Sequence, residues 1–222
     1  MKRAAFVVIL IFALATVAGA QEFEKGITAK GVKFGLNTSN FTNTGGLFTT
    51  RTGLGIGVFA TYSLSPHFAI QPELLYMQKG TSWGFFIDVD WPANYLEVPI
   101  LAKVTAMPQK TFQPCLFVGP ALGILLSSSV TVEYDGETDL DVDVTEGMNS
   151  TDFSFVFGGG FALKFTSFTV TLDVRYTIGL TDFLDAQKIN ALAYPDDPDR
   201  QLLYEDPDSQ NSCMSILWGV SF

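Results

Sequence analysis

Apolar and polar side chains alternate along this chain with a period of two residues. In residues 53–64 one face carries Leu, Ile, Val, Ala, Tyr and Leu, and the other carries mostly Gly, Thr and Ser. A period of two is typical of β-strands, whereas a helical period of 3.6 would mix the two sets. The pattern recurs in eight segments, which are residues 32–37, 53–64, 68–79, 95–104, 112–124, 153–165, 168–178 and 213–222.

The connections between these segments alternate between short and long. The short ones are residues 65–67, 107–110 and 166–167, and the long ones are about 39–52, 80–92, 127–151 and 181–210. In an up-and-down barrel the short turns then lie at one rim with both termini, and the long loops lie at the other. Tilted strands of about ten residues cross a bilayer. The sequence therefore predicts an all-β, eight-stranded antiparallel up-and-down transmembrane β-barrel.

Side-chain volume predicts which face of the strands points outward. The interior of an eight-stranded barrel is only wide enough to be filled by a limited set of side chains. The large apolar set is too voluminous for it, whereas the set rich in Gly, Ala, Ser and Thr fits. An apolar exterior is tolerated in lipid. The alternative, a soluble lipocalin-like barrel with the apolar set inside, also has eight strands and a secretory signal.

Charged residues of both signs share the inward parity. Because buried charges must be paired, we expect a salt-bridge network that plugs the barrel. An ion or proton path is the functional alternative to this structural role. The predicted interior network comprises Lys33, Glu73, Glu97, Lys103, Asp173 and Arg175, and Lys79 has the same parity.

The first twenty residues have the three parts of a secretory signal peptide. Lys2 and Arg3 precede an apolar run, and the Ala18-Gly19-Ala20 triplet fits the rule for cleavage after Ala20. The apolar run is shorter than the ~20 residues that a spanning helix needs, although an uncleaved anchor is the alternative. We expect a signal peptide at 1–20 and an outer-membrane β-barrel domain at 21–222.

The overall charge is acidic, with 23 Asp and Glu against 13 Lys and Arg. This balance argues against nucleic acid as a partner. The loop at 127–151 contains seven acids and no base, and the loop at 181–210 contains eight acids and two bases. The stretch from Asp139 resembles the start of a calcium loop, but Val144 and Ser150 occupy the positions where an EF-hand needs Gly and Glu. Weak binding of divalent cations at these loops is the alternative to solvated acidic loops.

The residues that could support catalysis are few. His67 is the single histidine and lies in a short turn, so a Ser-His or Cys-His pair at the outer rim is not expected. A hydrolase that uses carboxylates alone, with Asp88 and Asp90, is the alternative.

Cys115 and Cys213 lie on strands that are not neighbours, and we expect two free, buried thiols. The glycines of residues 53–57 lie inside a strand, which argues against a dinucleotide loop. We predict no enzyme activity, no cofactor and no metal site.

The C-terminal stretch alternates to its last residue. Trp218, Val220 and Phe222 share the predicted lipid-facing parity. A terminal aromatic residue after alternating apolar residues resembles the signal that is read by the outer-membrane barrel assembly machinery. Phe222 also fits the aromatic girdle at the periplasmic interface.

Five stretches resemble the PorT-like outer-membrane β-barrel family, which is common in Bacteroidetes. They are residues 31–41, 71–80, 95–104, 118–127 and 173–182, and the QPELLY and YLEVPI sequences are the most specific among them. The resemblance implies an eight-stranded barrel in the outer membrane of a Gram-negative bacterium and implies little about activity.

The leading hypothesis is a small, non-enzymatic outer-membrane barrel with acidic extracellular loops for surface interaction, envelope integrity or an envelope complex. The expected partners are outer-membrane lipid, the barrel assembly machinery and an extracellular or envelope protein. A narrow pore for small solutes or cations and an outer-membrane hydrolase are the alternatives.

Overall fold

The computed structural model describes residues 25–41, 49–84, 88–134, 137–182, 188 and 210–222. The predicted signal peptide at 1–20 and most of the 181–210 loop lie outside these residues. The strands are β1 (Gly26–Phe41), β2 (Thr49–Ser63), β3 (Phe68–Gly84), β4 (Asp88–Thr105), β5 (Phe112–Tyr134), β6 (Glu137–Asp143), β7 (Thr151–Lys164), β8 (Thr169–Asp182) and β9 (Gln210–Ser221). A short 3₁₀ turn, η1 (Thr145–Gly147), follows β6. Among the described residues, no helix has the length and apolar character needed to cross a membrane.

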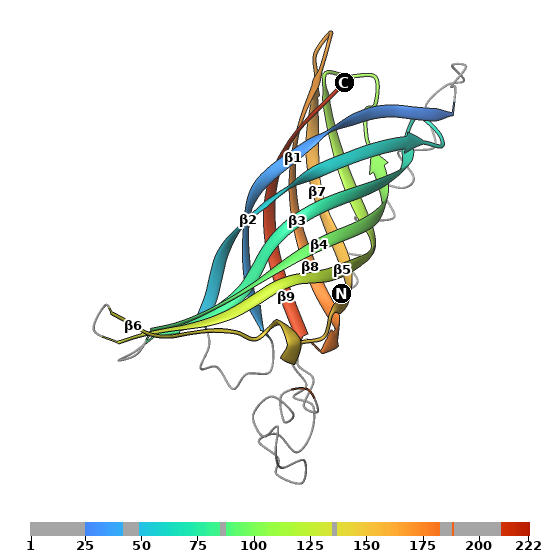
Figure 1. Ribbon diagram of the computed structural model, residues 1–222. Helices are drawn as coiled ribbons and strands as arrows, with labels where there is room; N and C mark the ends of the chain where they lie inside the picture. The colour runs from blue at the N-terminus through green and yellow to red at the C-terminus, as the bar shows by residue number, and fades with distance from the viewer. Residues whose placement is uncertain (1–24, 42–48, 85–87, 135–136, 183–187, 189–209) are drawn as a thin grey trace, which may run out of the picture.

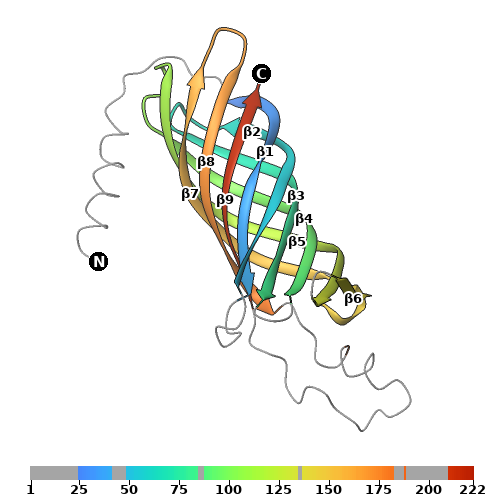
Figure 2. The same cartoon turned by 90° about the vertical axis from the view of Figure 1, so that its left-hand side faces the viewer.

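Eight of the strands form a closed antiparallel barrel. Their order around the wall is β4-β3-β2-β1-β9-β8-β7-β5, and β4 also pairs with β5, which completes the circle. Figure 2 shows β9 lying alongside β1, so the first and last strands form the closing seam. The predicted eight-stranded up-and-down barrel is confirmed.

The ninth strand, β6, is an extension outside the barrel wall. It pairs only with the distal part of β5, between Ser129 and Tyr134. In Figure 1, β3, β4 and β5 run on beyond the rest of the barrel to the tip where β6 folds back. This hairpin occupies much of the predicted loop at 127–151.

The strands are longer than the sequence pattern predicted. They contain 12 to 23 residues in the barrel wall, instead of about ten. The predicted loop at 80–92 is largely a hairpin, because Thr81 pairs with Trp91 and Gly84 pairs with Asp88. The loop predicted at 39–52 is shortened in the same way, since β1 runs to Phe41 and β2 starts at Thr49. Backbone pairing continues above the apolar belt, where an apolar face is no longer needed.

The apolar face points outward, as predicted from volume. Val32, Phe34 and Leu36 of β1 are each about half exposed, while the intervening Lys33 is 1% exposed. The interior also contains large side chains, which form separate small clusters: Leu75, Met77 and Leu217 form one, and Leu101, Phe117 and Val156 belong to another. The lumen is therefore filled by side chains, with charged groups between the apolar clusters.

Candidate functional site

Four buried charged residues from three strands meet inside the barrel. Lys33 Nζ lies 2.6 Å from Glu73 Oε1 and 2.5 Å from Asp173 Oδ2. Arg175 Nη1 lies 2.7 Å from Glu73 Oε2, and its Nη2 lies 3.4 Å from Asp173 Oδ2. We call Lys33, Glu73, Asp173 and Arg175 the rim-side cluster, because it lies nearer the rim of the short turns. The structure brings these four predicted residues together.

Each charge in the rim-side cluster has two opposite charges as partners. The cluster contains two cations and two carboxylates, and all four residues are at most 3% exposed. Aromatic rings cover the cations, because Lys33 Nζ lies 4.8 Å from the ring centre of Phe59 and the Arg175 guanidinium lies 5.4 Å from that of Phe117. Every charge in the cluster has an opposite charge beside it, which offsets part of its desolvation, and Asp173 Oδ1 and Arg175 Nε have no hydrogen-bond partner among the described residues.

A second group of charges lies nearer the long loops. Lys79 forms an ion pair with Glu97, and its Nζ lies 3.4 Å from Asp152 Oδ2. Asn211 Nδ2 donates to Asp152 Oδ2 at 3.1 Å, and the ring of Tyr95 lies 5.2 Å from Lys79 Nζ. We call Lys79, Glu97, Asp152 and Asn211 the loop-side cluster. It contains one cation and two carboxylates.

Two of the predicted network residues therefore lie outside the rim-side cluster. Glu97 belongs to the loop-side cluster, and Lys103 contacts neither group of carboxylates directly. Lys103 Nζ donates to Gln71 Oε1 at 3.1 Å, while Gln71 Nε2 donates to Glu73 Oε1 at 2.7 Å. Gln71 is completely buried and separates Lys103 from the rim-side cluster.

Sequence reasoning missed Asp152 and Gln71 as parts of these polar groups. Asp152 falls between the predicted loop at 127–151 and the predicted strand at 153–165, yet it has the same inward parity as Ser154. Gln71 has the inward parity but carries no charge, so a prediction of ion pairs does not include it.

The last strand forms the seam with β1 up to the final residue. Phe222 N donates to Lys30 O at 2.9 Å, and Lys30 N donates to Phe222 O at 3.1 Å. The Phe222 side chain is 80% exposed, and Trp218 stacks on Phe34 with ring centres 6.2 Å apart. Val220 is partly exposed on the same outer face. The lipid-facing parity predicted for Trp218, Val220 and Phe222 is confirmed, and their role as an assembly signal stays a prediction.

Both cysteines are free and buried, as predicted. Cys115 is 6% exposed and Cys213 is 1% exposed. They lie on β5 and β9, which are not adjacent in the wall.

The acidic segments are only partly covered by the structure. Asp90 is paired with Arg51 at 2.9 Å, and the side chain of Asp88 lies outside the described residues. Asp143 Oδ1 accepts a hydrogen bond from Thr145 N at 2.8 Å, and hydrogen bonds from Thr145 hold the pKa of this exposed carboxyl below its ordinary value. In the described parts of the chain no group of three metal-ligating side chains is assembled. Cation binding at the acidic loops stays a prediction.

The closed wall, apolar exterior and ionic interior define a transmembrane β-barrel protein. Residues 20–185 match the family model described as outer membrane protein beta-barrel domain, and the chain belongs to this family. The protein is an outer-membrane protein of a Gram-negative bacterium. No curated protein matches the chain.

Several solved barrels are similar to this chain at low identity. Neisserial surface protein A is 12% identical, with 87% of this chain and 97% of that one covered and a TM-score of 0.45. Ail, the attachment invasion locus protein of Yersinia pestis, is 11% identical over 90% of this chain and 100% of its own, with a TM-score of 0.44. OprG from Pseudomonas aeruginosa is 12% identical over 92% and 99%, with a TM-score of 0.45.

Proposed function

We propose that this protein is a non-conducting, non-enzymatic outer-membrane barrel that presents its long-loop end for contacts with a surface or envelope partner. The observation that carries the proposal is the filled lumen. The rim-side and loop-side clusters lie in succession along the barrel interior, and each is locked by ion pairs between different strands.

Large apolar side chains fill the space between and beside the two clusters. These inward-pointing side chains have exposed fractions of at most 1%, which shows that the lumen around them is filled; they are Leu75, Tyr95, Leu101 and Leu217. An eight-stranded barrel has an interior only just wide enough for side chains. A hydrated path for solutes would need these side chains to move together, so the interior supports a structural role.

The long-loop end supports the role in contacts. Short periplasmic turns and longer outer loops are the usual arrangement of bacterial barrels, so the β5–β6 hairpin projects from the cell. Its sequence contains seven acids between residues 127 and 151. An acidic, protruding hairpin favours a partner with a basic surface, since charge complementarity sets orientation and association rate.

The absence of enzyme activity is part of the proposal. His67 lies in the β2–β3 turn, and its Nδ1 donates to the carbonyl of Thr105 at 2.9 Å. The ring is thereby fixed at the periplasmic rim, away from the projecting hairpin. Membership of the PorT-like family is likewise proposed, on the sequence resemblance alone.

Conductance of the purified full chain in planar bilayers tests the closed lumen. We expect no discrete current steps in wild-type protein and no swelling of proteoliposomes in small sugars. The matched comparison is a Glu73→Ala and Arg175→Ala double variant, in which the rim-side cluster is opened. Reproducible single-channel steps in the wild type would establish the narrow pore and reject the proposal.

A pull-down from intact cells tests the contact role. A tag in the 181–210 loop should recover an envelope or extracellular protein, and recovery should fall when Asp139 and Asp141 of β6 are replaced by Asn. The control is Asp182→Asn, which changes an acid outside the hairpin. Equal recovery by the β6 variant and its control would reject the hairpin as the contact surface.

A further inference from the structure

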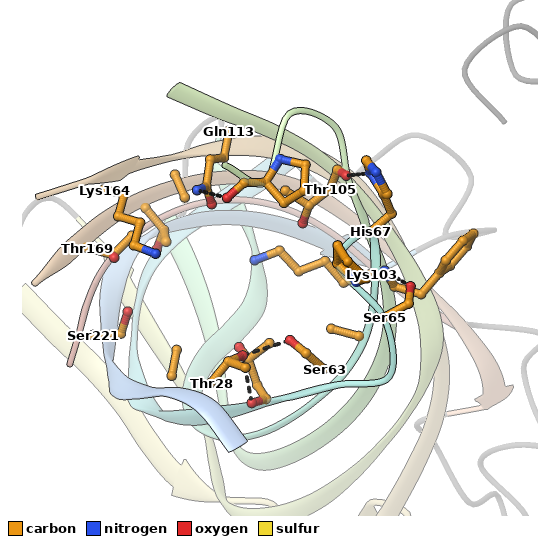
Figure 3. A pocket seen from close by; sticks show the side chains of 18 of the residues that line it. Thr28, Ser63, Ser65, His67, Lys103, Thr105, Gln113, Lys164, Thr169 and Ser221 are labelled. Atoms are coloured by element: carbon orange, nitrogen blue, oxygen red, sulfur yellow. Dashed lines mark hydrogen bonds between the residues drawn. The ribbon is translucent and has the colours of Figure 1, made fainter. Parts of the chain in front are cut away.

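The periplasmic end of the barrel contains a cavity of about 370 Å³. It opens between the short turns and is lined by residues of the eight wall strands where these strands meet the short-turn rim, together with residues of the β2–β3 and β4–β5 turns. Figure 3 shows this opening, with hydroxyl side chains of Thr28 and Ser63 on one side and Lys164 and Thr169 on the other. Cavities of this size hold small molecules.

The charge of the cavity is of one sign. Lys103 and Lys164 line it, and none of the described lining residues is Asp or Glu. Lys103 is 91% buried, since its exposed fraction is 9%, and its ammonium extends into the opening in Figure 3. Its hydrogen bond is to the Gln71 amide oxygen, so this buried cation has a neutral partner.

The amide of Gln71 separates the cavity from the rim-side cluster. Its nitrogen donates to Glu73, and its oxygen accepts from Lys103 and, at 3.2 Å, from Thr61 Oγ1. The carboxylates of the rim-side cluster are already shared between Lys33 and Arg175. The ammonium of Lys103 therefore faces the cavity, and the carboxylates of the rim-side cluster do not form an ion pair with it.

A second buried polar group also faces this space. Thr171 is 5% exposed and lines the cavity, and its Oγ1 has no hydrogen-bond partner among the residues that the structure describes. Buried hydroxyls normally have a partner. The Thr171 hydroxyl and the Lys103 ammonium are thus both available to an acceptor that enters from the rim.

We propose that this cavity is a binding site for a small oxyanion, the phosphate or carboxylate group of a periplasmic molecule. Lys103 supplies the buried positive charge, and Lys164 supplies a second positive charge at the mouth of the cavity. The hydroxyl groups that line the cavity, with Thr171 among them, form hydrogen bonds to the ligand. Charge-assisted hydrogen bonds to an oxyanion are the interactions that these groups provide. The site is independent of the long-loop end.

The test uses the full mature chain in a neutral detergent, with inorganic phosphate and acetate as separate probes and sodium chloride at matched ionic strength. Amide resonances of Thr105, Thr171 and Ser221 should shift saturably with at least one oxyanion. The preferred probe identifies the group as phosphate or carboxylate. Shifts that are linear in concentration, or that sodium chloride reproduces, would overturn the proposal.

Variants at the same rim assign the effect to the cavity. Lys103→Met should weaken binding by about tenfold or more, the scale of one charge-assisted hydrogen bond. Lys110→Met removes a charge from a residue of the β4–β5 turn that does not itself line the cavity, and it should leave the affinity unchanged. Lys164→Met, at the end of β7, provides a second variant if Lys103→Met does not fold. An affinity in the cavity variants equal to that of Lys110→Met would also overturn the proposal.

Discussion

Lys33 Nζ and Glu73 Oε1 lie 2.6 Å apart inside the barrel, although 40 residues separate them in the chain. The pair joins β1 to β3, which flank β2 in the wall, and Arg175 connects Glu73 to β8 on the opposite side of the barrel. Opposite walls are thus connected through side chains as well as around the circumference.

Glu73→Gln should destabilise the barrel strongly. The substitution leaves Lys33 and Arg175 with one carboxylate between them in a buried site, and loss of one partner of a buried pair costs about 3–5 kcal/mol. Urea unfolding in detergent, followed by tryptophan fluorescence, measures the change. The control is Arg51→Gln, which breaks the partly exposed pair with Asp90 and should cost at most about 1 kcal/mol. Similar losses in both variants would contradict the role of the rim-side cluster.

Gly35→Ala should impair closure of the seam. A Cβ at this position would lie 2.0 Å from Ile216 O, a backbone atom of β9 that cannot move without breaking the ladder. Overpacking of this kind costs about 1–3 kcal/mol. Gly26→Ala is the matched control, since a Cβ there meets nothing within 4 Å. The fraction of protein with heat-modifiable gel mobility reports closure, and equal fractions would refute the prediction.

Phe222→Ser and deletion of Phe222 should separate two roles of the last residue. The serine variant retains both main-chain hydrogen bonds to Lys30, and the deletion loses them. If the ring is an assembly signal, both variants assemble poorly in cells. Their refolding in detergent micelles should differ, with the deletion the slower. Normal assembly of the serine variant in cells would show that the Phe222 ring is not an assembly signal and serves only in the aromatic girdle.

Cys115 and Cys213 should react with a maleimide only after unfolding. Both thiols are at least 94% buried, with exposed fractions of 6% and 1%. Mass spectrometry after timed labelling, with and without denaturant, counts the modified sites. Rapid labelling of Cys213 in the folded protein would show that the loop-side end of the lumen opens to solvent.

The architecture was predictable because lipid and lumen impose opposite demands on alternate residues. Phe34 and Lys33 are neighbours in sequence, and one is apolar while the other is charged. This alternation predicts a strand and also predicts which of its faces points to the lipid. The additional strand length was less predictable. Thr81 and Trp91 pair above the lipid belt, where backbone hydrogen bonds suffice and no apolar face marks the strand.

The composition of the ionic interior was predictable, but its division into clusters was not. The alternation of apolar and polar residues predicts that Glu97, Lys103 and Lys33 all point into the lumen. Which of these charges form ion pairs depends on the tilt and stagger of the strands, and the alternation does not reveal either quantity. Register pairs Lys103 with Ala69 and Phe117, well away from the carboxylates of the loop-side cluster.

The seam between β1 and β9 also determines the timing of folding. Its paired residues, from Gly31 with Ser221 to Phe41 with Asn211, are about 170 to 190 positions apart in the chain. Contacts of such long range form slowly, because the intervening chain must be ordered before they contribute. During this interval the unpaired edges of the growing sheet are exposed to other chains. A slower closure of this seam therefore lengthens the time during which the chain can aggregate.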